Sequence, residues 1–264
     1  MRLASTPVHG YRMNLSAGLH PPSPPVAELE RRIQWPLVAV GAFLVMMLGL
    51  LGMAAWSSWA PSPPIVGIPN DPDVRAARDL VSAIAPPGSS ELRFESEFLA
   101  AAGAARPATA ADAWRIAGAT ALVARARARA PGDPRLTLCA AHLELARRDY
   151  AGAERGYRSV LYFGDRCPEA HLGLGLSLAL AARMERDVIY GRSLELQSIA
   201  QFAAVRERDA PYLAAAYDRV VMLARVGRNG EARGRAAEYL ARDSTSPWAE
   251  RLRGIAGVGS TPLP

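Results

Sequence analysis

The residues that could carry out chemistry in this sequence are few and poorly clustered. Cys139, His142 and Glu144 lie within six positions of one another. On a helix Cys139 and His142, three apart, would share a face as two metal ligands can. A third ligand at a suitable spacing is missing, and His171 lies well beyond this group. We therefore interpret both histidines as satisfied core or surface residues and predict neither a metal site nor a cofactor.

The sequence also lacks the motifs of the common enzyme classes. It has no HExxH, CxxC, CxxCH or GxSxG motif, and without a lysine it cannot form a lysine-bearing phosphate loop. No pair of carboxylates has a spacing typical of acid–base catalysis. A cell-wall hydrolase stays a minor alternative, and we predict a protein that is not an enzyme.

Two cysteines, Cys139 and Cys167, leave a second question open. They are 28 positions apart, so a disulfide between them would close a loop of stabilising size. Cys139 also lies among leucines, where a buried free thiol would pack equally well. Because the sequence does not give the distance between the two Cα atoms, both alternatives stay open.

The chain around these residues is organised by one apolar run, Pro36 to Trp56, with the sequence PLVAVGAFLVMMLGLLGMAAW. It carries no charge and is long enough for one membrane-crossing helix, which we predict over residues 36–58. A cleaved signal peptide is the alternative, but the lead-in and the apolar core are both longer than is usual for one.

The distribution of arginine predicts the orientation of this helix. Arg31 and Arg32 directly precede the run, whereas the first basic residue after it, Arg75, follows two aspartates. The positive-inside rule then places the N-terminus in the cytoplasm and the C-terminal region in the periplasm of a bacterial inner membrane. All 31 basic residues are arginine, which is typical of a GC-rich bacterial genome, and the net charge of +6 is too diffuse to indicate nucleic acid.

The flanking segments are short. We expect a disordered cytoplasmic tail over residues 1–35, a proline-rich linker over 59–71 that holds the domain off the membrane, and a flexible tail over 257–264. Residues 72–107 predict a pair of helices, the first capped by Asp71 and the second opening at Ser90. Thr109 and Asp112 then predict the start of a third helix.

Residues 108–256 contain a repeated pattern. The short breaks Arg148–Gly152 and Gly227–Gly230 are each followed by Ala-x-x-x-aromatic or Ala-x-x-x-Ala, which are Ala153 with Tyr157 and Ala232 with Ala236. Small residues at such positions let one helix approach its neighbour closely. His171-x-x-Leu-Gly175-x-x-Leu has the spacing of the first-helix motif W-x-x-L-G-x-x-Y.

This pattern resembles the tetratricopeptide repeat (TPR). The resemblance implies a TPR-like α-solenoid of helical hairpins, and together with the apolar run it predicts an all-α fold in which a single transmembrane helix precedes that solenoid. In that family the first helices line a groove that receives a partner segment, and our candidate groove residues on them are Glu144, Arg147, His171, Arg183, Tyr217 and Arg225.

The sequence departs from the repeat in one long stretch. No second-helix motif can be placed in Glu185–Asp209, which we treat as an insert and as a second candidate contact region. Residues 172–180 alternate like a strand, but Leu172, Leu176 and Leu180 also share a helical face, and we favour a helix there.

Together these features predict a membrane-anchored periplasmic scaffold or adaptor that binds another envelope protein, or a subunit of a membrane complex. An assembly chaperone resembling the TPR factors of cytochrome c maturation is the main alternative.

Overall fold

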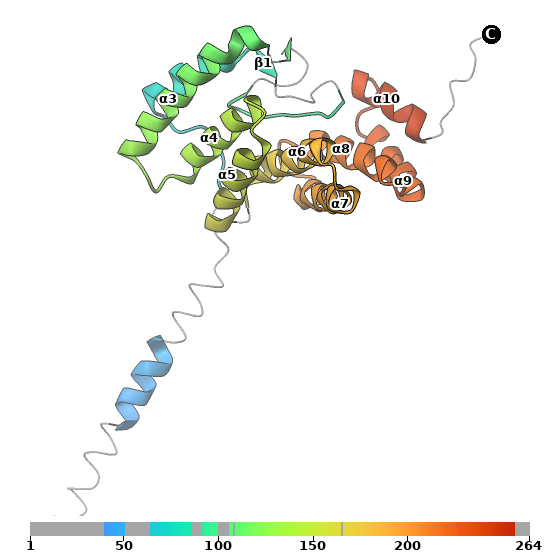
Figure 1. The fold of residues 1–264 in the computed structure, drawn as a ribbon. Coiled ribbons are helices and arrows are strands. Elements are labelled where there is room, and N and C mark those ends of the chain that lie inside the picture. The colour runs from blue at the N-terminus through green and yellow to red at the C-terminus, as the bar shows by residue number, and fades with distance from the viewer. Residues whose placement is uncertain are drawn as a thin grey trace, which may run out of the picture. The chain divides into compact units, whose positions relative to one another are not determined.

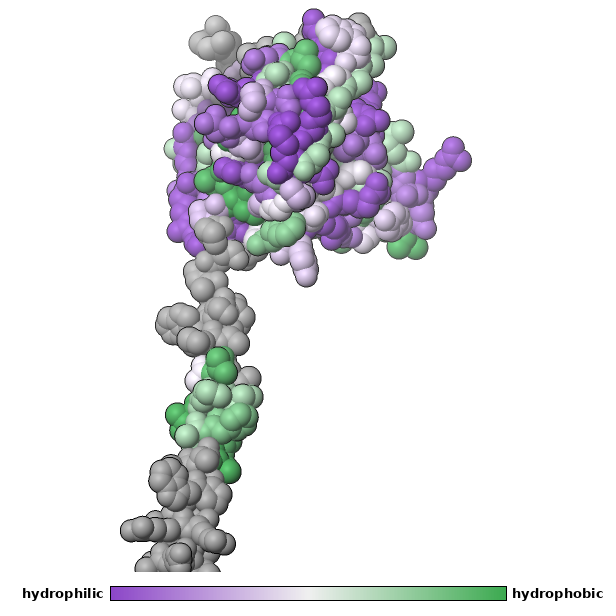
Figure 2. Space-filling view, turned by 90° about the vertical axis from the view of Figure 1, so that its left-hand side faces the viewer, coloured by the Kyte–Doolittle hydropathy of each residue, from purple (hydrophilic) through white to green (hydrophobic). Residues whose placement is uncertain are grey.

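The computed structural model describes residues 40–50, 64–85, 91–99, 106–107, 109–164 and 166–256. The chain divides into two compact units, Met1–Pro61 and Ser62–Pro264. In the first unit residues 40–50 are helical, and their large apolar side chains are exposed (Figure 2). No helix among the described residues is both long and apolar enough to cross a membrane. Most of the predicted span 36–58 and both predicted tails lie outside the described residues.

The second unit is built almost entirely from helices (Figure 1). In chain order they are α2 (Pro72–Val81), a 3-10 turn (Ala110–Asp112), α3 (Ala113–Arg129), α4 (Pro134–Ala146), α5 (Tyr150–Phe163), α6 (Pro168–Met184), α7 (Val188–Ala204), α8 (Tyr212–Arg225), α9 (Asn229–Leu240) and α10 (Pro247–Ala256). Between α2 and α3, the two-residue strand β1 (Ile84–Ala85) pairs in parallel with β2 (Arg106–Pro107). The expected all-α class is confirmed apart from this short ladder.

Helices that follow one another in the chain pack together as hairpins. The pairs α4–α5, α6–α7 and α8–α9 are each joined by a short connection, and α10 packs against α9 and α8. The first helices also contact one another, α4 with α6 and α6 with α8. This is the stacked arrangement of helical hairpins that the repeat pattern predicts.

Local sequence explains where several helices begin. The side chains of Asp71, Asp133, Asp149 and Asp187 accept hydrogen bonds from backbone N–H groups in the first turns of α2, α4, α5 and α7. Thr109 and Asp112 form the predicted capping box ahead of α3. The expected starts of the helices after Asp71 and after the Thr109–Asp112 pair, now α2 and α3, are therefore confirmed.

Helix α6 lies at the centre of the array. Every residue from Leu172 to Leu180 is buried, which explains why this stretch alternates like a strand although it is a helix. A helix surrounded by neighbours needs apolar or small residues on all faces. A Cβ at Gly175 would lie 2.5 Å from Cε1 of Phe202, so α6 and α7 pack too closely for any larger residue.

Two expectations about the helices are wrong. Residues 91–99, where the helix opening at Ser90 was expected, are extended chain and bends, so among the described residues of the range 72–107 only α2 is helical. The stretch Glu185–Asp209 is not an extra insert between hairpins. It forms α7, which packs on α6 as its second helix, and both helices are 17 residues long against 13 and 14 for α4 and α5.

Candidate partner-binding groove

The surface formed by the first helices is already covered by a segment of the chain itself. Residues 91–99, which we call the strap, run past α4, α6 and α8 in the long connection between α2 and α3 (Figure 1). Leu92, Phe94, Phe98 and Leu99 of the strap are almost completely buried. The strap is therefore part of the hydrophobic core of the second unit.

The two phenylalanines of the strap pack around His142 of α4. The ring of Phe94 meets the imidazole edge-on at 5.5 Å, and Phe98 stacks on it at 6.3 Å. The imidazole Nδ1 lies 2.7 Å from the Tyr157 hydroxyl oxygen, and Nε2 lies 3.3 Å from a carboxylate oxygen of Glu169. His142 is completely buried, and both its nitrogens have partners, as expected for a satisfied core histidine.

Glu169, at the start of α6, joins this histidine to the strap backbone. Its carboxylate accepts hydrogen bonds from the Ser96 hydroxyl at 3.2 Å and from the Glu97 N–H at 3.3 Å. Burial would raise the pKa of Glu169, but the hydrogen bond and charge interaction with His142, together with the hydrogen bonds from Glu97 and Ser96, outweigh burial and lower the pKa. Glu169 is thus held as a carboxylate that fixes the middle of the strap.

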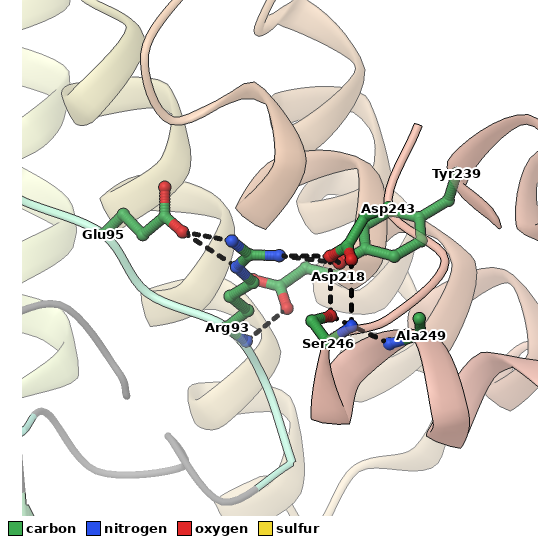
Figure 3. Close-up of polar contacts among 7 residues, drawn as sticks. All are labelled: Arg93, Glu95, Asp218, Tyr239, Asp243, Ser246 and Ala249. Carbon is green, nitrogen blue, oxygen red and sulfur yellow. Dashed lines mark hydrogen bonds and ion pairs between the residues drawn. The ribbon is translucent and has the colours of Figure 1, made fainter. Parts of the chain in front are cut away.

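Arg93 holds the strap on its polar side (Figure 3). Its backbone N–H donates to Oδ1 of Asp218 on α8 at 2.6 Å. Its guanidinium donates to the Tyr239 hydroxyl at 2.6 Å and forms an ion pair with Asp243 at 3.4 Å. Glu95 pairs with the same guanidinium at 2.6 Å. Arg93 therefore ties the strap to α8 and to α9 and the turn that follows it.

The pKa values of the two aspartates in this network are shifted in opposite directions. Burial raises the pKa of Asp218 well above its usual range, opposed only in part by the hydrogen bond from the Arg93 N–H. Burial also disfavours the charge on Asp243, but hydrogen bonds from Ser246 and Tyr239 outweigh it and lower the pKa to about 2. Oδ2 of Asp218 is buried without a hydrogen-bond partner among the described residues. A protonated Asp218 would reduce the cost of burying that oxygen.

The burial of the strap is too large for easy displacement. Fully burying a large apolar side chain stabilises a fold by about 1.5–3 kcal/mol, so the four buried strap residues contribute on the order of 6–12 kcal/mol. That is comparable with the whole stability of a typical domain. A partner segment would have to replace these contacts before it could use the surface of the first helices.

The six candidate groove residues do not form one surface. Arg183 forms an ion pair with Glu91 of the strap, and Tyr217 is buried between Tyr239 and Trp248. Arg225 pairs with Glu195 of α7 at 2.8 Å.

The other three have different partners. Glu144 and Arg147 pair with each other at 3.4 Å, and Arg147 also lines a separate groove of about 820 Å³ beside α3. Nδ1 of His171 lies 2.8 Å from the side-chain oxygen of Gln201, and His171 lines a cavity of about 730 Å³ at the start of α6.

The residues that hold the strap were not among the sequence candidates. Leu92, Phe94 and Phe98 are spaced by even numbers, which is the periodicity of an extended chain with one side buried. That signal was available in the sequence. Nothing in the sequence, however, pairs Arg93 with Asp218, because the two are 125 positions apart.

The two cysteines are buried free thiols in the structure. Burial raises the pKa of Cys139 far above its usual value and that of Cys167 to about 11. Among the described residues, no group of three or more His, Cys, Asp or Glu side chains is placed to hold a metal ion.

Large apolar side chains are exposed at the α6–α7 turn. Met184, Val188, Ile189 and Tyr190 are 75%, 83%, 83% and 53% exposed, respectively. Leu196, two helical turns after Ile189 on the same face of α7, is 45% exposed. We call these five residues the edge patch. It lies at the start of the stretch Glu185–Asp209, which the sequence indicated as a second contact region.

Comparison with known proteins places few limits on this chain. No family model matches it, and no curated protein shows significant similarity to it. Among solved structures it is similar to a thermophilic TPR protein of Thermus thermophilus, at 18% identity and a TM-score of 0.45. That similarity covers 55% of this chain and 73% of the other. The assignment as a TPR-like helical array therefore stands on the packing of the hairpins described above.

Proposed function

We propose that this protein is a membrane-anchored periplasmic scaffold that binds another envelope protein, as an adaptor or as a subunit of a membrane complex. The edge patch carries the proposal. Soluble domains rarely leave several large apolar side chains exposed together unless another molecule covers them. Because the strap fills the surface of the first helices, the partner contacts the edge patch and not that surface.

The anchor is the predicted helix over residues 36–58. Its described part, residues 40–50, is helical, and Phe43, Val45 and Leu48 are among its exposed apolar side chains. An isolated helix of this composition would be poorly solvated in water and well solvated in lipid. The arginines before the span support the periplasmic location of the second unit.

The partner is an apolar segment of another protein that buries the edge patch. A photo-crosslinking residue at position 189 of the full-length chain should yield an adduct with one protein in native membranes. The matched control is position 114, because Trp114 is 64% exposed on α3, far along the chain from the patch. Mass spectrometry of the adduct would name the partner.

A second measurement tests whether the patch holds the complex together. Val188→Asp with Ile189→Asp should release the crosslinked protein during gentle detergent extraction, whereas Trp114→Asp should not. Equal crosslinking from positions 189 and 114, or a complex that survives the double substitution, would exclude the edge patch as the docking surface.

A further inference from the structure

The linker ahead of the second unit is shorter than the sequence suggests. Its residues from Pro64 onward pack on the unit: the Ile65 N–H donates to the Arg166 carbonyl oxygen at 3.0 Å, and Ile65 and Ile68 contact the core. From the predicted end of the span at residue 58 to residue 64 the backbone reaches at most about 22 Å, whatever its conformation.

The point of attachment lies at one particular edge of the helical array. We define the tether edge as Val66, the α5 end Tyr162–Phe163, Arg166 before α6, and Arg206 and Arg208 in the α7–α8 connection. A cavity of about 730 Å³ joins most of these segments, with Val66 and all three arginines in its lining. The edge patch begins at the opposite end of α6, whose 17 residues span about 25 Å.

These lengths favour one edge of the unit as the edge near the bilayer. If the edge patch faced the membrane with α6 perpendicular to it, the attachment point would be about 25 Å from the surface, which is beyond the reach of the tether. The tether edge, by contrast, can lie directly on the surface.

The side chains of the tether edge suit a lipid interface. Tyr162 is 89% exposed and Phe163 55% exposed, and their rings meet edge-on at 6.2 Å. Val66 is exposed as well. Exposed aromatic side chains are costly in water but favoured in the headgroup region of a bilayer, where their apolar rings and the tyrosine hydroxyl are both accommodated.

The arginines supply charge for the same surface. The guanidinium groups of Arg166, Arg206 and Arg208 have no hydrogen-bond or ion-pair partner among the described residues, although this chain pairs many of its other arginines. Arginine is well suited to bind phosphate groups.

Three carboxylates line the cavity too, Glu97, Glu169 and Asp209. Two of them are engaged within the fold. Glu169 is hydrogen-bonded to His142 and the strap, and Asp209 accepts the Arg206 N–H at 2.7 Å. Glu97 remains as a surface carboxylate on the strap.

We infer that the tether edge is a membrane-contact surface, with Tyr162 and Phe163 in the headgroup region and the three arginines against phospholipid phosphates. The inference rests on the proposed anchor. It turns the edge patch away from the bilayer, toward the periplasmic partner.

The test uses the full-length protein in vesicles of phosphatidylcholine with phosphatidylglycerol. An environment-sensitive fluorophore is attached to cysteine introduced by Tyr162→Cys, Phe163→Cys or, as the matched control, Ile189→Cys, a position nearly as exposed as Tyr162. The unsubstituted protein, whose two cysteines are buried, measures background labelling. Lipids carrying a spin label near the headgroup then quench any fluorophore that touches the bilayer.

We expect at least about twofold quenching at positions 162 and 163 and none at position 189. No quenching at 162 and 163, or equal quenching at all three positions, overturns the inference. A photo-crosslink from position 162 to a protein in native membranes, with no quenching by lipid, would mean that this edge binds a protein instead.

The charge of the lipid tests the role of the arginines. Quenching at position 162 should weaken in vesicles of phosphatidylcholine alone, and Arg166→Gln with Arg206→Gln and Arg208→Gln should abolish that dependence. An identical response in both lipids overturns the assignment of the arginines. Extraction of the protein by alkaline carbonate would instead refute the anchor, and with it the proposed function, so the two failures are distinguishable.

Discussion

The backbone N–H of Arg93 donates to the buried Oδ1 of Asp218 across 125 positions of sequence, at 2.6 Å. This bond fixes one end of the strap on α8. It helps to explain how part of the long connection between α2 and α3 is packed into the core. It also makes the stability of the array sensitive to a single buried carboxyl group.

Asp218→Asn should remove a pH dependence of stability. Because burial raises the folded pKa of Asp218 above its unfolded value near 3.8, its protonated form favours the fold at low pH. That contribution is lost as the pH rises from about 4 through the folded pKa. Asparagine keeps an oxygen for the Arg93 N–H but does not titrate. As the pH rises from 4 to 8, the thermal midpoint of the variant should rise relative to that of the unsubstituted protein. A constant difference between the two thermal midpoints over this range would contradict the prediction.

Asp218→Ala should be much worse than Asp218→Asn. It leaves the Arg93 N–H without its acceptor in a buried site and opens a cavity, which costs about 2–4 kcal/mol of unfolding free energy. Urea unfolding of the two variants in the same detergent measures the difference. If both variants lost the same amount, the hydrogen bond to the strap would have no energetic role.

Phe94→Ala should loosen the strap. Removing a fully buried phenylalanine that packs on His142 costs about 3–5 kcal/mol. The strap should then become a site of limited proteolysis, with cleavage mapped to residues 91–99. Trp114→Ala, at an exposed position, is the control and should change stability by less than about 0.5 kcal/mol.

Gly175→Ala should destabilise the protein although alanine favours helices. The new Cβ would lie 2.5 Å from the buried ring of Phe202, and such overpacking costs about 1–3 kcal/mol. Gly230→Ala in α9 meets nothing within 4 Å and should stabilise by up to about 1 kcal/mol. If both substitutions raised the free energy of unfolding by the same amount, that result would contradict the close approach of α6 and α7.

The cysteines should react slowly with thiol reagents in the folded protein. Burial raises the pKa of Cys167 to about 11, so its thiolate fraction at pH 8 falls about 100-fold relative to an ordinary cysteine. We expect two alkyl groups to add after denaturation without reductant, measured by intact mass. No addition until a reductant is present would establish the Cys139–Cys167 bridge instead.

The sequence by itself determined the local elements of this protein. Asp71 before Pro72 and the Thr109–Asp112 box predicted the starts of α2 and α3, because capping involves residues only two or three positions apart. The spacing of small residues predicted stacked hairpins, and Gly175 marked a close approach of α6 and α7, the two helices of one hairpin. In α6 the apolar pattern allowed both strand and helix, since a helix buried on all sides has no polar face to show its period.

Only the tertiary structure decided what those hairpins enclose. The spacing of Phe94 and Phe98 fits an amphipathic helix or an extended chain. Which of the two conformations forms depends on packing against His142, about fifty positions away. The partners of Arg93 on α8 and α9 are farther still. Tyr217, which the repeat pattern places on a first helix, is buried because α9 and α10 cover it. Such long-range contacts depend on how the folded helices close over one another, and the energy that selects them comes from burial that no local segment of sequence contains.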